Sequence, residues 1–206
     1  MYWQKKKLIY DILIPPIAKP FEEFTVKEAE NYFNWHMSNL NERALYLAKY
    51  SNVQLDYSVN SLIKIWTWFL KVAEIEKTQK EKLNEIRNQL KSKPKDFIDT
   101  ILKEQSEQFS LETEYIIRDI AMYFGEAIVK NNNSIYWGYH TDIKKDSFAN
   151  MPLLMGFEDR DFNPPFQTAF EPVFIVHGIA CNIFDNGHNK NDLVNMYKKW
   201  QRMIFN

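Results

Sequence analysis

The stretch Ser110–His140, SLETEYIIRDIAMYFGEAIVKNNNSIYWGYH, decides the fold. Its first part predicts a helix, because Ser110 suits an N-cap, acidic residues fill the first turn and apolar residues then recur at helical spacing. The asparagine run at 131–133 ends this helix, since asparagine tolerates left-handed backbone geometry. The aromatic segment 135–139 that follows predicts a β-strand. A buried helix that leads directly into a strand indicates a mixed α+β fold.

Two small residues, Ala121 and Gly125, lie one turn apart on this predicted helix. Glycine usually weakens a helix interior, so its presence indicates that another element approaches the backbone closely. Trp137 follows within the predicted strand, and we expect it to be buried against Gly125. The alternative is that Trp137 is displayed on the sheet as a binding residue.

The first two thirds of the chain predict helices. Segment 8–24 carries three prolines among apolar residues, which predicts an extended arm packed on the body. Thr25 and Glu28 form a capping box that begins a helical part over 25–130, with a first helix to about residue 50. A second helix, from about 58 to 76, carries Trp66 and Trp68 about 200° apart. This helix is therefore either packed on both sides or displays one tryptophan.

Residues 74–107 have a different composition, with lysine and glutamate in balanced numbers and only a thin apolar stripe, interrupted by Pro94. The pattern predicts two solvated helices that form an exposed arm or edge. Such a segment is either a plain charged surface, or a mobile lid or partner surface.

Three segments predict strands of a small, largely antiparallel sheet within 134–180, namely 135–139, 153–157 and 172–179. A last helix, predicted over 191–205, closes the sheet. Because helical signals come first and strand signals later, we expect the two kinds of element to be segregated rather than alternating. The sequence thus predicts one α+β domain over residues 1–206.

Charge and cysteine content limit the classes of function. The chain has 26 basic and 27 acidic residues, and nucleic-acid-binding proteins usually show a basic excess, so we expect no nucleic-acid partner. No stretch has transmembrane length, and segment 8–17 lacks the features of a signal peptide, so we expect no membrane association. The single cysteine, Cys181, fits a reducing compartment, which predicts a cytoplasmic location.

Motifs that carry chemistry are sparse. Asp119 and Glu126 fall on one face of the predicted helix, which would suit acid–base chemistry, with His36 as a third candidate. The two carboxylates would equally pair with the basic residues Arg43, Arg118 or Lys130. The sequence leaves both alternatives open.

The candidate metal ligands are His177, Asp185 and His188, which lie at and after a predicted strand. No HExxH motif, no paired CxxC motif and no glycine-rich nucleotide loop occurs. We therefore expect no metal and no cofactor.

Aromatic residues give a stronger indication of function. Periodicity does not place all of five aromatic residues in the core, namely Trp35, Tyr46, Trp68, Trp137 and Tyr139. Tryptophan and tyrosine are favoured anchors at protein interfaces. These five either form an interaction surface or fill the core of an aromatic-rich domain.

The chain resembles small cytosolic proteins of Gram-positive bacteria that are associated with toxin–immunity neighbourhoods. Three segments carry the resemblance: KPFEEFTVKEAENYFNWHMSNLNERALYL, SLIKIWTWFL and IAMYFGEAIVKNNNSIYWGYH. It implies an immunity protein that occludes a toxin, and it carries no catalytic residues.

With the aromatic content and the missing catalytic motifs, this resemblance favours a non-enzymatic protein-interaction protein with a protein partner. The alternative is a small hydrolase or metal-dependent enzyme with a carboxylate and histidine site beside the sheet. The sequence leaves the oligomeric state open.

Overall fold

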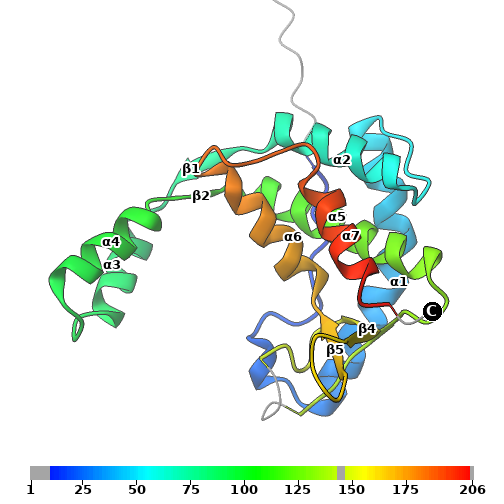
Figure 1. The fold of residues 1–206 in the computed structure, drawn as a ribbon. Helices are drawn as coiled ribbons and strands as arrows, with labels where there is room; N and C mark the ends of the chain where they lie inside the picture. Colours follow the sequence, from blue (N-terminus) through cyan, green and yellow to red (C-terminus); the bar gives the residue numbers. More distant parts are fainter. Residues whose placement is uncertain (1–9, 143–146, 205–206) are drawn as a thin grey trace, which may run out of the picture.

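The computed structural model describes residues 10–142 and 147–204. In these residues the chain is α+β, with a helical body, a helical arm and two small antiparallel sheets (Figure 1). The predicted fold class is therefore confirmed. The body consists of α1 (Val26–Ser51), α2 (Val59–Val72), α5 (Leu111–Asn131), α6 (Pro172–Ala180) and α7 (Asp192–Gln201).

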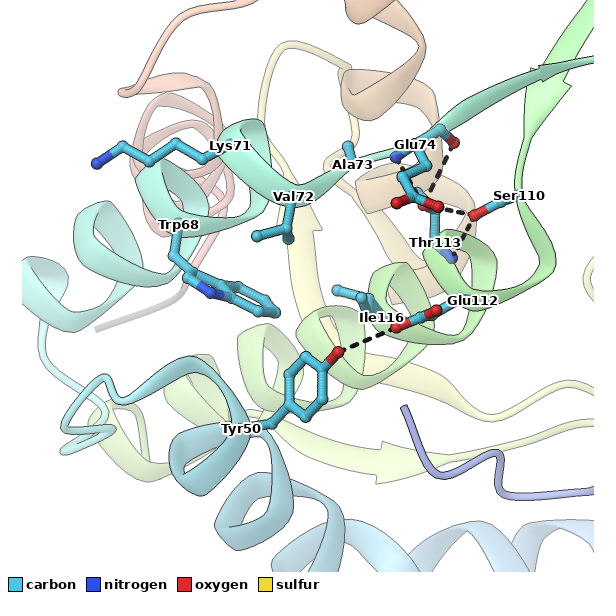
Figure 2. Close-up of a pocket in the computed structure, with 10 residues that line it drawn as sticks. All are labelled: Tyr50, Trp68, Lys71, Val72, Ala73, Glu74, Ser110, Glu112, Thr113 and Ile116. Carbon is cyan, nitrogen blue, oxygen red and sulfur yellow. Dashed lines mark hydrogen bonds between the residues drawn. The ribbon is translucent and has the colours of Figure 1, made fainter. Parts of the chain in front are cut away.

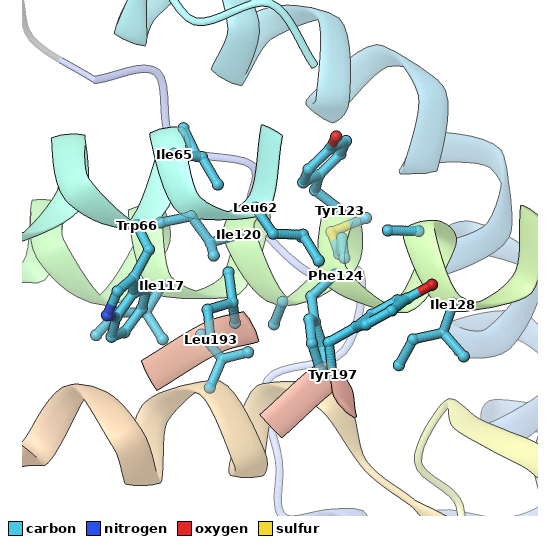
Figure 3. Packing of buried hydrophobic residues seen from close by; sticks show 14 of the residues in the cluster. Leu62, Ile65, Trp66, Ile117, Ile120, Tyr123, Phe124, Ile128, Leu193 and Tyr197 are labelled. Carbon is cyan, nitrogen blue, oxygen red and sulfur yellow. The ribbon is translucent and has the colours of Figure 1, made fainter. Parts of the chain in front are cut away.

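Helix α5 is the centre of the core. Helices α1, α2 and α6 pack against it, and α7 packs against α2 and α6. Trp66 of α2 is fully buried, whereas Trp68 is half-buried, so α2 is packed on one side and partly open on the other. Figure 3 shows apolar side chains from α2, α5 and α7 meeting in one cluster, among them Leu62, Ile65, Trp66, Ile117, Ile120, Phe124, Leu193 and Tyr197.

The long helices begin where the sequence predicts. The backbone N–H of Glu28 donates to the Thr25 hydroxyl over 3.3 Å, and the Thr25 N–H donates to the Glu28 carboxylate over 2.7 Å. This reciprocal pair is the expected capping box of α1. Ser58 and Ser110 cap α2 and α5 through their hydroxyls. Helix α2 ends at Val72, earlier than expected, because the chain becomes extended from Ile75.

The charged segment forms the exposed arm that the sequence predicts. Helices α3 (Lys80–Gln89) and α4 (Lys95–Glu104) lie side by side and stand clear of the body in Figure 1. A two-stranded ribbon carries them, in which β1 (Ile75–Lys77) pairs antiparallel with β2 (Glu107–Phe109). The sequence analysis did not predict this ribbon.

The second sheet has the order β3–β4–β5, with β3 at Tyr136–Gly138, β4 at Leu153–Asp159 and β5 at Phe166–Phe170. Its register places Trp137 opposite Leu154. The β4–β5 register shifts between Leu154 and Phe157, where Gly156 has φ of 99° and the carbonyl oxygen of Ser134 fills the place of a side chain. A side chain at Gly156 would be strained there, so glycine is required.

The predicted strand at 172–179 is wrong, since this segment forms the helix α6, and the sheet ends at Phe170 rather than near 180. Both carboxylate oxygens of Glu171 accept backbone N–H groups, from Val173 and Phe174, which caps the helix. Pro172 occupies the first turn, where its missing N–H costs nothing. The periodicity of a short apolar run does not distinguish a strand from a helix. Strand β5 was not predicted, because only its last residue is buried and its sequence shows no apolar alternation.

The N-terminal segment 10–20 runs without regular structure along α1 and α5, as predicted for an extended arm, and a short 3₁₀ turn, η1 (Phe21–Glu23), follows. Residues 8 and 9 of that prediction, like residue 205 of the predicted closing helix, lie outside the described residues. Another 3₁₀ turn, η2 (Cys181–Ile183), separates α6 from the loop that leads into α7.

Candidate functional site

The arm presents a surface that the body does not cover. None of the residues of α3 or α4 is buried. The aliphatic side chains of the two helices are half-buried against one another, and Phe97 of α4 is 47% exposed. Charged residues of both signs surround this apolar stripe. We call the exposed apolar face of α4, with Phe97 at its centre, the arm face.

A first hollow of about 430 Å³ lies where the arm joins α2 and α5 (Figure 2). The Tyr50 hydroxyl donates to Glu112 over 3.0 Å, and Figure 2 shows this bond crossing the hollow below Trp68. Burial, and then the hydrogen bond to Glu112, raises the pKa of Tyr50 to about 12. A phenol with this pKa stays protonated at neutral pH and acts as a hydrogen-bond donor.

A second hollow, of about 460 Å³, lies where the arm approaches α6 and η2. There Nε2 of His177 lies 3.3 Å from a carboxylate oxygen of Glu114, and Nδ1 of the same ring lies 3.6 Å from Sγ of Cys181. This thiol, imidazole and carboxylate follow the order found in cysteine nucleophile sites.

The electrostatics of this second hollow oppose a thiolate. Burial, and then the charge of Glu114, raises the pKa of the Cys181 thiol. Cys181 also follows the last residue of α6, at the helix end where the dipole disfavours negative charge. The hydrogen bond with Glu114 raises the pKa of His177. The arrangement therefore favours a neutral thiol beside a His177–Glu114 pair.

A cavity of about 370 Å³ lies under the N-terminus of α6. It is lined by aromatic side chains and by four ionisable residues from three elements, His36 of α1, Arg118 of α5, and Glu171 and His177 at the cap and in the body of α6. His36 is 6% exposed and Glu171 is 8% exposed. Burial lowers the pKa of His36 to about 3 and raises the pKa of Glu171 to about 7.

The predicted catalytic carboxylates do not form a common site. Asp119 is fully buried and accepts hydrogen bonds from Arg43, over 2.9 and 2.5 Å, and from the Tyr10 hydroxyl, over 2.5 Å. Glu126 accepts the indole N–H of Trp137 over 2.8 Å and lies 3.6 Å from Lys130. Each carboxylate is thus committed to its own structural contact, which is the alternative that the sequence analysis left open.

Two of the three candidate metal ligands lie in one place. His177 and Asp185 both line the second hollow, where His177 pairs with Glu114, whereas His188 is exposed. Across residues 10–142 and 147–204, no group of three or more histidine, cysteine, aspartate or glutamate side chains is arranged to hold a metal ion.

None of the five candidate interaction aromatics is fully exposed. Trp137 is buried, and the other four are half-buried. Tyr46 accepts the backbone N–H of Asp11 over 2.6 Å, and Trp35 lies beside Arg118. Trp68 borders two hollows, one on each of its sides. The packing alternative therefore describes Trp137, and the exposed aromatic of the arm is Phe97, which the sequence analysis did not select.

The sequence analysis gave no binding role to two of the residues that line the cavity under α6. Arg118 appeared only as an ion-pair partner, and Glu171 was assigned to no role. The Glu171-Pro172 pair before an apolar run was the available signal, because it matches the start of a helix. No local signal predicts that three distant segments meet.

Comparisons of the chain with known protein families, curated proteins and solved structures gave no match. Among the described helices, none combines the length and apolar content that crossing a lipid bilayer would need.

Proposed function

We propose that this protein is a non-enzymatic interaction protein that binds a partner protein through the arm face. The observation that carries the proposal is that α3 and α4 bury no residue, yet hold Phe97 47% exposed on a ribbon away from the body. Helices of ten residues are marginal on their own, so this arm gains little stability from its fold. A partner that covers the arm face would supply the missing burial.

The chemistry of the arm face suits a protein partner. Protein interfaces combine an apolar centre with a polar rim, and aromatic residues contribute much of the binding energy. Phe97 supplies the exposed apolar centre, beside the half-buried Ile98, Ile101 and Leu102, and the adjacent lysine and acidic side chains supply the rim. The balanced charge of this rim favours a specific partner rather than a polyanion.

The resemblance noted in the sequence would make a toxin the partner and occlusion of that toxin the function. That identity stays a prediction. The carboxylate pair no longer supports the enzymatic alternative, since Asp119 and Glu126 are held in separate contacts.

Affinity purification of the tagged protein from its native host tests the proposal. Phe97→Ser should abolish recovery of the partner, as should an arm-deleted variant in which residues 79–105 are replaced by Asn-Gly, a favoured two-residue hairpin turn. Phe162→Ser and Phe166→Ser are matched controls, because these aromatic residues are 61% and 60% exposed in and beside the β4–β5 loop.

The control variants should retain the partner at wild-type levels. A partner recovered equally well by the arm-deleted variant would contradict binding through the arm. Recovery of no partner by the wild-type protein under gentle conditions would contradict the interaction function itself.

A further inference from the structure

The cavity under the N-terminus of α6 carries an inference that is independent of the arm. Its aromatic walls come from η1, the segment that precedes β4, and α6, through Phe21, Phe148 and Phe174. Phe174 is 63% exposed and its ring lies 5.3 Å from that of Phe148, which places these two residues where the cavity meets the surface. A volume of about 370 Å³ is near the small end of the range for small-molecule sites, so it suits a compact ligand.

Arg118 brings a positive charge that has no carboxylate partner in the described residues. Its Nη2 donates to the carbonyl oxygen of Leu13 over 2.5 Å, and its buried Nε has no hydrogen-bond partner. Its sequence neighbour, Asp119, is already bonded to Arg43 and Tyr10. Burial lowers the pKa of Arg118, so its surroundings disfavour the charge that it carries. A bound anion would offset the cost of burying this charge, and a planar carboxylate fits a guanidinium best.

Glu171 brings the opposite charge and also has no ionic partner in the described part of the chain. Its two oxygens accept the N–H groups of Val173 and Phe174, which leaves further acceptor positions on a carboxylate. Burial raises the pKa of Glu171 to about 7, and no cation in the described residues pairs with it, since His177 of the same cavity pairs with Glu114. A ligand cation would pair with Glu171.

His36 adds a neutral polar group to the same cavity. Its ring is 6% exposed and packs 4.8 Å from the ring of Trp137, and its buried Nε2 has no hydrogen-bond partner within residues 10–142 and 147–204. Unpaired buried polar atoms are costly, so a site of this kind is completed by something that bonds to it. Either tautomer of a neutral imidazole serves here, as a donor or as an acceptor.

The two charges face a common region. Burial raises the pKa of Tyr32, and its hydroxyl also feels Arg118, which lowers that pKa, and Glu171, which raises it. Tyr32 lines the same cavity. Yet Arg118 and Glu171 form no salt bridge with each other. The cavity thus holds a cation and a carboxylate that are near each other but unpaired.

We propose that this cavity binds a small zwitterion with an apolar body, of the class of a free aromatic or branched amino acid. The ligand carboxylate would pair with Arg118, the ligand ammonium with Glu171, and the apolar body would lie among Phe21, Phe148 and Phe174. A ligand with only one charge leaves the other protein group buried and unpaired, which costs affinity. His36 then supplies one hydrogen bond to the ligand.

Titration calorimetry of the full chain with a matched ligand series tests the proposal. L-phenylalanine and L-leucine carry every required group. N-acetyl-L-phenylalanine lacks the ammonium, phenethylamine lacks the carboxylate, and glycine lacks the apolar body. We expect at least one of the two complete amino acids to bind, and each incomplete ligand to bind at least about tenfold more weakly, the scale of one lost charge-assisted hydrogen bond.

Variants assign the binding to this cavity. Arg118→Met and Glu171→Gln should each weaken the complete ligand at least about tenfold. Arg87→Met and Glu104→Gln make the same changes on the exposed arm and should leave affinity unchanged. Arg118→Lys keeps the charge but lacks the planar guanidinium. It replaces Arg118→Met in the experiment if Arg118→Met does not fold.

Two results would overturn the proposal. One is the absence of binding by L-phenylalanine and L-leucine at millimolar concentration to the wild-type protein. The other is equal binding of the complete and the incomplete ligands, which would show that the two unpaired charges do not select a zwitterion. Neither result depends on the arm, so both are distinguishable from failure of the proposed interaction function.

Discussion

The ring of Trp137 fills the space that a Cβ atom on Gly125 would occupy. A Cβ built on Gly125 would overlap Cζ2 and Cη2 of the indole, so the strand β3 lies against the backbone of α5. The indole N–H also donates to Glu126, one residue further along α5, over 2.8 Å. Helix and sheet are joined at this point by both packing and a hydrogen bond. The packing was predicted from the pairing of small residues with Trp137, whereas the hydrogen bond was not.

Substitutions at this junction should be costly from either side. Trp137→Ala should destabilise the fold by about 3–5 kcal/mol, the usual scale for a large aromatic removed from a core. Gly125→Ala should cost about 1–3 kcal/mol, because the added methyl overpacks the contact. Urea unfolding of both single variants and the double variant measures the coupling. If Gly125→Ala stabilises the protein, as alanine does in an open helix, the close contact is wrong.

The buried Arg43–Asp119 pair should behave as a pair. Arg43→Met leaves the fully buried Asp119 without its main donor, so we expect a loss of about 3–5 kcal/mol. The double variant Arg43→Met with Asp119→Leu removes both charges and should be more stable than Arg43→Met alone. Thermal and urea unfolding measure both effects. A double variant that is less stable than the single one would contradict charge burial as the cause.

The cavity groups should give opposite pH slopes of stability. The folded-state pKa of Glu171, about 7, is raised from 4.5, so its stabilising effect is present below pH 4.5 and is lost as the pH rises towards 7. The folded-state pKa of His36, about 3, is lowered from 6.5, so its contribution is present above pH 6.5 and is lost as the pH falls. Between pH 4.5 and 6.5 these two slopes, each about 1.4 kcal/mol per pH unit, oppose each other.

Single variants should therefore uncover one slope at a time. Relative to the wild-type protein, His36→Phe should lose stability as the pH rises from 5 to 6, and Glu171→Gln should gain it, each by about 1 kcal/mol. Urea unfolding at the two pH values measures this difference. His188→Asn and Glu104→Gln change exposed residues and should reproduce the wild-type slope. Equal slopes in all variants would mean that neither group has a shifted pKa.

The features that could be predicted from the sequence were those set by residues close together in the chain. The helix at 110–130, its end at the asparagine run and the approach of Trp137 to Gly125 follow from residues close together in the chain, and they were predicted. The solvated arm at 74–107 was predicted from its composition alone. The helix α6 was taken for a strand, because its apolar run is too short to show a helical period.

The cavity was not predictable, because its ionisable residues are contributed by α1, α5 and α6 with its cap. Asp119 and Glu126 looked like a pair because they share a helix face, but the tertiary partners Arg43 and Trp137 lie elsewhere in the sequence and separate their roles. Spacing along one helix therefore identified candidate side chains without identifying their partners.

Cys181 should react slowly as a nucleophile. Because burial and Glu114 raise its pKa, alkylation by iodoacetamide should show a pH midpoint above that of an unfolded cysteine. Glu114→Gln should lower this midpoint, since it removes the negative charge, whereas Glu104→Gln, in the same hollow, should not. Mass spectrometry of alkylation against pH measures the midpoint. A thiol that reacts fastest near neutral pH would restore a nucleophilic role for Cys181 with His177.

The arm should be the least stable part of the described chain. Local opening requires little energy where few apolar contacts are buried, and α3 and α4 bury none of their residues, whereas α5 is buried along most of its length. Amide hydrogen exchange should therefore be fast throughout α3 and α4 and slowest in α5. The variant with residues 79–105 replaced by Asn-Gly should keep the wild-type unfolding temperature within a few degrees, because the helices α3 and α4 that it removes bury none of their residues. Arm amides protected as strongly as those of α5 would show that the arm packs on something in the free protein, and the arm face would then not be available to a partner.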